Sequence, residues 1–267
     1  AADLVGRHLK PAGGVICLGR PAIARQDSAY SEALDDWLRK TQLGEQSAVQ
    51  QDDNWVTLTR GTLPGAGNWS HQYAEPGNTA SSGDKVVQGG LGVLWYGDPG
   101  PELMVNRHQG AVGPLVVDGR MFVQSETSLM AYDAYNGLQL WEVENPEAVR
   151  TGVFRNIAPG NLAAGEDLLF HMTPDRVFAH DVATGEVKAV YTLPEAVNRE
   201  THQWGYIAYR DGRLFGTATT REVIARQFRR RGNPGAAATD AIFAIDTSTG
   251  EHLWTYQGKS IDFQAIA

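Results

Sequence analysis

The sequence predicts a mainly β protein, a partial β-propeller of four-stranded antiparallel blades preceded by a small α/β segment. Two observations predict the blades: a turn of the form Ala-x-Asp-x-x-x-Gly occurs three times, and a second hairpin precedes each copy. A third observation is that the first 66 residues contain neither pattern. We therefore expect residues 1–66 to form the α/β segment and residues 67–267 to form about three blades of an incomplete ring.

The repeated turn closes a β-hairpin. The three copies are Ala131–Trp141, Ala179–Ala189 and Ala244–Trp254. In each copy the Asp side chain can accept hydrogen bonds from the turn backbone, and a glycine supplies a positive φ without strain. The strands before and after each turn are therefore expected to be neighbours. The equivalent turn glycines are Gly137, Gly185 and Gly250.

A second hairpin upstream of each copy brings every repeat to four strands. Two of these hairpins turn at Asp118-Gly119 and Asp211-Gly212, dipeptides that are typical of type I′ turns. Four short antiparallel strands every 40 to 50 residues or so are the signature of a propeller blade. The first two repeats are 48 residues apart, but the next interval is 65. Residues 221–238, rich in arginine and without strand alternation, account for the excess as a solvated surface loop or, alternatively, a contact for an anionic partner.

The repeat resembles the blade of the pyrroloquinoline-quinone (PQQ) repeat family. The motif Ala-x-Asp-x-x-(Thr/Asn)-Gly-x-x-x-Trp carries the resemblance, which covers about residues 69–267. In that family a Trp of the outermost strand packs between neighbouring blades, and the resemblance gives this docking role to Trp141 and Trp254. The second repeat has Ala189 at this place, so we expect weaker docking there.

Loops at one end of the predicted propeller form a candidate ligand site. Trp69–Ser82 and Leu91–Trp95 resemble the entry segment of quinoprotein propellers, although the same aromatic residues could simply pack the first blade. His, Arg and Trp side chains suit an anionic or sugar-like ligand through charge-assisted bonds and stacking. The alternative for each histidine is a loop residue bonded to the backbone. The candidates are His71, Arg107, His108, His202 and Trp204.

The family resemblance implies a cofactor whose ligands we do not find in this sequence. Quinoprotein dehydrogenases hold PQQ above a Ca²⁺ ion bound by carboxylate and amide oxygens, and use an Asp base beside two adjacent cysteines. This chain has one cysteine, Cys17, which we expect to be buried in the apolar run Val15–Leu18. We therefore expect no catalytic residue, no metal and no cofactor in this chain alone, and PQQ with calcium only in a longer parent protein.

Residues 1–66 resemble the C-terminal part of a class I, S-adenosylmethionine-dependent methyltransferase. The Gly-rich cofactor turn of that fold belongs to its first strands, so S-adenosylmethionine is also expected only in a longer parent. An unrelated α/β appendage is the alternative. The elements that carry the resemblance are a helix to Leu9, a turn at 10–14, a buried strand Val15–Leu18 of the parallel-sheet kind, a helix Ser31–Lys40 capped by Ser31, and a strand Asn54–Arg60.

Composition narrows the function further. Hydrophobic residues make up 42% of the chain and charged residues 20%, which is typical of a globular protein. The net charge of −8 argues against a nucleic-acid partner, and no apolar run approaches the roughly 20 residues of a membrane span. We predict a binding or assembly module, non-catalytic by itself, that contacts a protein or small-molecule ligand at the loop end. The alternatives are part of a PQQ-dependent dehydrogenase, or a methyltransferase fused to a propeller; the resemblance favours a periplasmic or secreted location.

Overall fold

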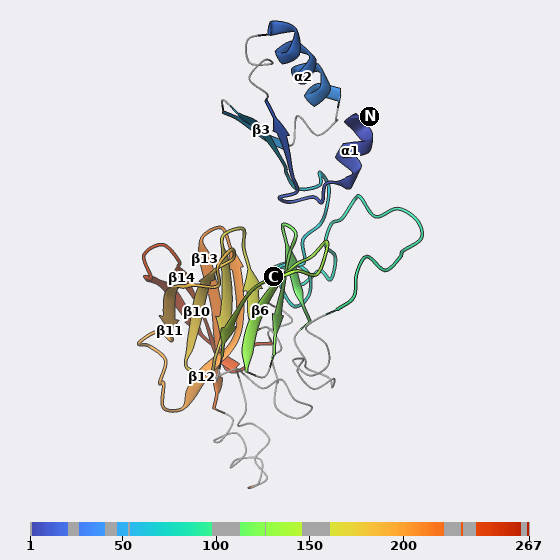
Figure 1. Cartoon of the computed structure of the whole chain (residues 1–267). Coiled ribbons are helices and arrows are strands. Elements are labelled where there is room, and N and C mark those ends of the chain that lie inside the picture. The colour runs from blue at the N-terminus through green and yellow to red at the C-terminus, as the bar shows by residue number, and fades with distance from the viewer. Residues whose placement is uncertain are drawn as a thin grey trace. The chain divides into compact units, whose positions relative to one another are not determined.

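The chain divides into two compact units, residues 1–66 with 85–90, and residues 67–84 with 91–267. The computed structural model is shown in Figure 1, where the labelled elements α1, α2 and β3, towards the blue end of the colour bar, belong to the first unit. Arg107 and His108, and most of the predicted loop at 221–238, lie outside the described residues. The structure describes residues 2–20, 27–40, 47–52, 54–97, 113–125, 127–145, 161–221, 231, 239–262 and 266.

The first unit contains a three-stranded antiparallel sheet of order β1-β3-β2. Its small core forms where the apolar side of helix α2 packs against the sheet, with Leu38, Val56 and Leu58 buried. Its elements are α1 Ala2–His8, β1 Val15–Gly19, α2 Ser28–Lys40, β2 Ser47–Gln51 and β3 Trp55–Arg60.

Two expectations for strand β1 are wrong. The strand pairs antiparallel with β3 rather than lying in a parallel sheet, and Cys17 is exposed rather than buried. The reason is that successive side chains of a strand point to opposite faces. Ile16 and Leu18 pack against the core beside α2, which leaves Val15 and Cys17 on the face that is not covered, and Val15 is 49% exposed.

The cap of helix α2 also differs from the prediction. The helix begins at Ser28, three residues before the predicted start. Asp27 Oδ1 accepts a hydrogen bond from the backbone N–H of Ala29 at 2.9 Å. Asp27 is therefore the N-cap, because its side chain pairs an N–H that the first turn leaves without a helical partner. Ser31 lies inside the helix.

The second unit contains three sheets, each of four antiparallel strands in chain order, which confirms the predicted fold class. We call them blades 1, 2 and 3; several of their strands are labelled in Figure 1. Blade 1 comprises β4 Leu115–Val117, β5 Arg120–Gln124, β6 Ser128–Asp133 and β7 Gln139–Glu144; blade 2 comprises β8 Leu162–Ala164, β9 Leu168–Met172, β10 Arg176–Asp181 and β11 Val187–Thr192; blade 3 comprises β12 His202–Arg210, β13 Arg213–Thr220, β14 Thr239–Asp246 and β15 His252–Gln257.

The turns inside the blades adopt the backbone that their residues favour. Asp118 and Gly119 have φ values of 47° and 79°, and Asp211 and Gly212 have 49° and 74°, the double positive φ of a type I′ turn. The turn glycines of the repeated motif have φ values of 74° to 76°, and each joins the third and fourth strands of its blade.

The first strands of the three blades lie side by side, because β8 contacts both β4 and β12. The fourth strands β7, β11 and β15 are at the opposite edges of their sheets. The largest core clusters lie between consecutive blades, so the sheets stabilise one another by burying their apolar faces.

Candidate functional site

Trp141 on β7 fills the contact between blades 1 and 2. Its side chain is 8% exposed, and its indole N–H donates a hydrogen bond to the carbonyl of Val182 at 3.0 Å. The ring lies over Gly185, where a Cβ atom would be 2.7 Å from Cε3 of the indole. Gly185 is therefore required twice, for its φ of 76° and for the close approach of the tryptophan.

Trp95 makes the same contact with the turn of blade 1. Its indole N–H donates to the carbonyl of Ala134 at 2.8 Å, and a Cβ atom on Gly137 would overlap its ring. Ala134 and Val182 each follow the Asp of the repeated motif. The sequence placed Trp95 in the entry segment without a docking role. Its equivalence to Trp141 could have been found from the similar spacing of each Trp to the Asp of the next repeated motif, Asp133 and Asp181.

Tyr191 takes over the carbonyl contact where the motif has Ala189 in place of Trp. Its hydroxyl donates to the carbonyl of Thr247 at 2.8 Å, and its side chain is 5% exposed. Thr247 follows the Asp of the third turn, so it matches Val182. Residues two apart in a strand share a face, which allows Tyr191 to reach from the sheet face that carries Ala189. A Cβ on Gly250 would meet no atom within 4 Å, so no indole covers this turn.

The corresponding face of blade 3 is uncovered among the described residues. Trp254 on β15 is the counterpart of Trp141, yet it is 45% exposed. Tyr256, two residues further on the same face, is 61% exposed. The Trp254 ring lies near Phe215 of its own blade, with centroids 6.4 Å apart.

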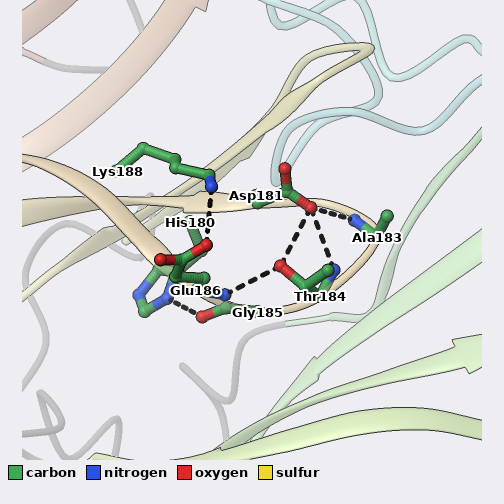
Figure 2. A network of polar contacts seen from close by, with 7 residues as sticks. All are labelled: His180, Asp181, Ala183, Thr184, Gly185, Glu186 and Lys188. Atoms are coloured by element: carbon green, nitrogen blue, oxygen red, sulfur yellow. Dashed lines mark hydrogen bonds and ion pairs between the residues drawn. The ribbon is translucent and has the colours of Figure 1, made fainter.

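The Asp of the repeated motif stabilises the turn between the third and fourth strands of a blade, as Figure 2 shows for Asp181. Asp181 Oδ1 accepts hydrogen bonds from the backbone N–H groups of Ala183 and Thr184 at 2.9 and 3.0 Å, and from the Thr184 hydroxyl at 3.1 Å. These bonds, led by that from Ala183, lower the pKa of Asp181, because they stabilise the carboxylate. The Asp246 carboxylate is bonded in the same way by Ser248 and Thr249.

His71 ties the entry segment to the blades. Trp69 pairs with Val116 of β4, and the backbone carbonyl of Ser70 accepts a hydrogen bond from the backbone N–H of Ala164 of β8 at 2.9 Å. The backbone N–H of Tyr209 on β12 donates to His71 Nε2 at 3.0 Å. The entry segment therefore contacts the first strand of all three blades.

The hydrogen bonds of His71 fix its tautomer. Because Nε2 accepts from Tyr209, the ring proton is on Nδ1, which lies 2.8 Å from the Ser70 hydroxyl oxygen. Desolvation lowers the pKa of His71 to about 4, although the nearby Glu75 acts in the opposite direction. The side chain is 2% exposed, so this candidate is a neutral histidine inside the fold, with both ring nitrogens bonded.

The other described candidates lie at the far end of β12 from His71's partner Tyr209. His202 is the first residue of the strand, and its Nε2 lies 3.1 Å from Asp240 Oδ2. Trp204 is 1% exposed and packs edge-on against Phe243, with centroids 5.0 Å apart. His202 and Trp204 therefore lie two residues apart at the start of β12, whereas His71 contacts Tyr209 near the end of that strand.

Within the described part of the chain, no group of three or more His, Cys, Asp or Glu side chains could hold a metal ion. No helix within those same ranges is long and apolar enough to cross a membrane.

Comparison with known proteins places these observations among relatives. A family model described as outer membrane protein assembly factor BamB matches residues 65–254. A search of curated proteins returned no match. A solved europium-containing methanol dehydrogenase is similar over 74% of this chain and 33% of its own, with 19% identity and a TM-score of 0.50.

Two further solved structures are similar over smaller parts. A quinohemoprotein alcohol dehydrogenase from Comamonas testosteroni is 18% identical over 71% of this chain and 27% of its own, with a TM-score of 0.47. BamB from Moraxella catarrhalis is 15% identical over 54% of this chain and 39% of its own, with a TM-score of 0.36. The chain spans well under half the length of these structures, and at such identities the likeness concerns the fold alone.

Proposed function

Because the chain belongs to the family described as outer membrane protein assembly factor BamB, we propose that it is a binding and assembly module. In this proposal its blades hold further protein segments, and the chain by itself performs no catalysis. The family's name refers to assembly at the outer membrane, so a periplasmic location is part of the same proposal.

The observation that carries the proposal is the uncovered face of β15. On β7 and β11 the equivalent faces hold Trp141 and Tyr191, which are 8% and 5% exposed because the next blade covers them. On β15 the same face presents Trp254 at 45% and Tyr256 at 61% exposure. Exposed aromatic side chains of this size are typical of interaction surfaces.

The covered contacts define what would bind there. Trp141 meets a turn that offers a carbonyl acceptor at Val182 and a glycine with positive φ at Gly185. The partner of Trp254 is therefore a turn of the same kind, with an Asp before the free carbonyl and a Gly three residues after that carbonyl. A further blade supplies such a turn, whether it belongs to a longer chain or to a second protein.

Site-specific photocrosslinking tests this function. Benzoylphenylalanine replaces Trp254 in the full chain, expressed in the cells that make the protein, and replaces Leu140 in a matched control. Leu140 suits the control because it is 40% exposed on β7. We expect crosslinks from position 254 to peptides that contain the Asp-x-x-x-Gly turn. Crosslinks equal to those of the control, or crosslinks only to unrelated segments, would overturn the assembly function.

The dehydrogenase alternative makes a different prediction. A chain that forms part of a PQQ-dependent enzyme should bind PQQ in the presence of Ca²⁺. Calorimetric titration of the purified chain measures this directly, and we expect no micromolar binding. Micromolar binding, with an alcohol oxidised in the presence of an electron-accepting dye, would favour the dehydrogenase.

A methyltransferase origin for the first unit stays a separate proposal. The predicted order of helix, turn, strand, helix and strand supports it, and β2 is an additional strand that the sequence analysis did not predict. S-adenosylmethionine would then bind to a Gly-rich turn encoded upstream of this segment. Sequencing the upstream reading frame tests the proposal, which fails if no such turn is encoded there.

A further inference from the structure

A cavity lies between blades 1 and 2, apart from the entry segment and the face of β15. Its volume is about 230 Å³. Apolar walls come from both blades: Leu129 and Val143 from the first, and Phe178 and Val187 from the second. A cavity of about 150 Å³ with such walls is enough to admit benzene, so this one has room for a substituted ring.

His180 lines this cavity, and one of its ring nitrogens is buried with no partner among the described residues. His180 is 6% exposed, and its Nδ1 lies 2.9 Å from the carbonyl oxygen of Gly185. Because a carbonyl can only accept, the ring proton is on Nδ1 and Nε2 carries a lone pair. His180 Nε2 is buried and makes no hydrogen bond to any described residue. An unpaired buried acceptor of this kind is unfavourable, and a donor on a ligand would satisfy it.

The neighbouring His171 makes no hydrogen bond with His180 Nε2. His171 Nε2 lies 2.7 Å from the amide nitrogen of Asn145, which donates to it. The ring centroids of His171 and His180 are 6.2 Å apart, as are those of Phe178 and His180. Burial lowers the pKa of both histidines, so both are neutral near pH 7 and Nε2 of His180 keeps its lone pair.

The charged lining residues balance one another. Glu144 and Arg176 both border the cavity and carry opposite charges. A net charge on the ligand would therefore gain attraction from one and repulsion from the other. Together with the apolar walls, this favours a neutral ligand.

We propose that the cavity between blades 1 and 2 binds a small neutral aromatic molecule that carries one O–H or N–H donor for His180 Nε2. The ring packs between Val143 and Val187, which come from the two facing blades. The site does not depend on the assembly function, because neither Trp254 nor Tyr256 contributes to the cavity.

Nuclear magnetic resonance of the full chain labelled with ¹⁵N-histidine tests the site, with phenol as the probe. Toluene and anisole are matched controls, since both have a similar ring but lack the donor. We expect phenol to shift the Nε2 resonance of His180 saturably and to bind at least about tenfold more tightly than either control, as one hydrogen bond is worth about that factor. His252, which does not line the cavity, serves as an internal reference.

Two variants make the test independent of any single side chain. His180→Phe removes the acceptor but keeps a ring, and we expect phenol to lose its advantage over toluene. Val187→Trp fills the cavity from a half-exposed position on β11, and we expect binding of phenol and both controls to be lost. Absence of saturable phenol binding to the unaltered chain, or equal affinity for phenol and toluene, would overturn the proposal.

Discussion

Two glycines with the same backbone conformation should respond very differently to alanine. Gly185 and Gly250 both have φ of 76°, so Gly→Ala carries the same left-handed strain at each, about 1–2 kcal/mol. The restriction of the unfolded chain by alanine is also the same. The positions differ in what a Cβ would meet: the Trp141 ring at 2.7 Å for Gly185, and no atom within 4 Å for Gly250.

The size of the difference follows from the contact. A Cβ at Gly185 displaces the indole of Trp141, which breaks its bond to Val182, worth about 1 kcal/mol, and loses part of its packing. Complete removal of a buried Trp side chain costs about 3–5 kcal/mol, which sets the upper limit. We therefore expect Gly185→Ala to lower the free energy of unfolding by about 2–4 kcal/mol more than Gly250→Ala.

Urea unfolding at equilibrium, with the slope of the transition checked in each variant, measures both free energies. A double-mutant cycle sharpens the result: in a Trp141→Ala background, Gly185→Ala should cost no more than Gly250→Ala does in the unaltered chain. If the two glycine variants differ by less than about 0.5 kcal/mol, the tryptophan does not depend on the glycine, and the docking argument is refuted.

Three further predictions use the same unfolding assay. Trp141→Ala should cost about 3–5 kcal/mol and Trp254→Ala less than about 1, since the first is 8% and the second 45% exposed; similar losses would contradict the contrast between the blades. Tyr191→Phe should cost about 1 kcal/mol by removing its bond to Thr247, and no loss would mean that this bond does not hold the blades. His71 has a pKa of about 4 in the fold against an ordinary 6.5. Its contribution to the free energy of unfolding, up to about 3 kcal/mol, is therefore complete above pH 6.5 and is lost as the pH falls through 4. The His71→Gln variant should lack this part of the pH dependence of unfolding, and a profile equal to that of the unaltered chain would contradict the prediction.

The sequence by itself determined the local geometry of the blades. An Asp followed by Gly allows the double positive φ of the turn at Asp118, and the motif glycines allow the φ near 75° at the longer turns. These conformations depend on residues adjacent in the chain, so three aligned copies were sufficient to predict four strands in each blade. Residues 1–66 had no repeat to support them, and there the exposure of Cys17 and the cap at Asp27 were missed.

Only the tertiary structure decided which side chains join the blades and which remain uncovered. Tyr191 replaces the missing tryptophan because its hydroxyl, two residues after Ala189, reaches the equivalent carbonyl of the next blade. That carbonyl belongs to Thr247, 56 residues away in the chain. His71 becomes a buried link because Tyr209, 138 residues later, donates to it. Such contacts depend on how far two sheets approach each other, a distance set by all the packing between them and by no local pattern.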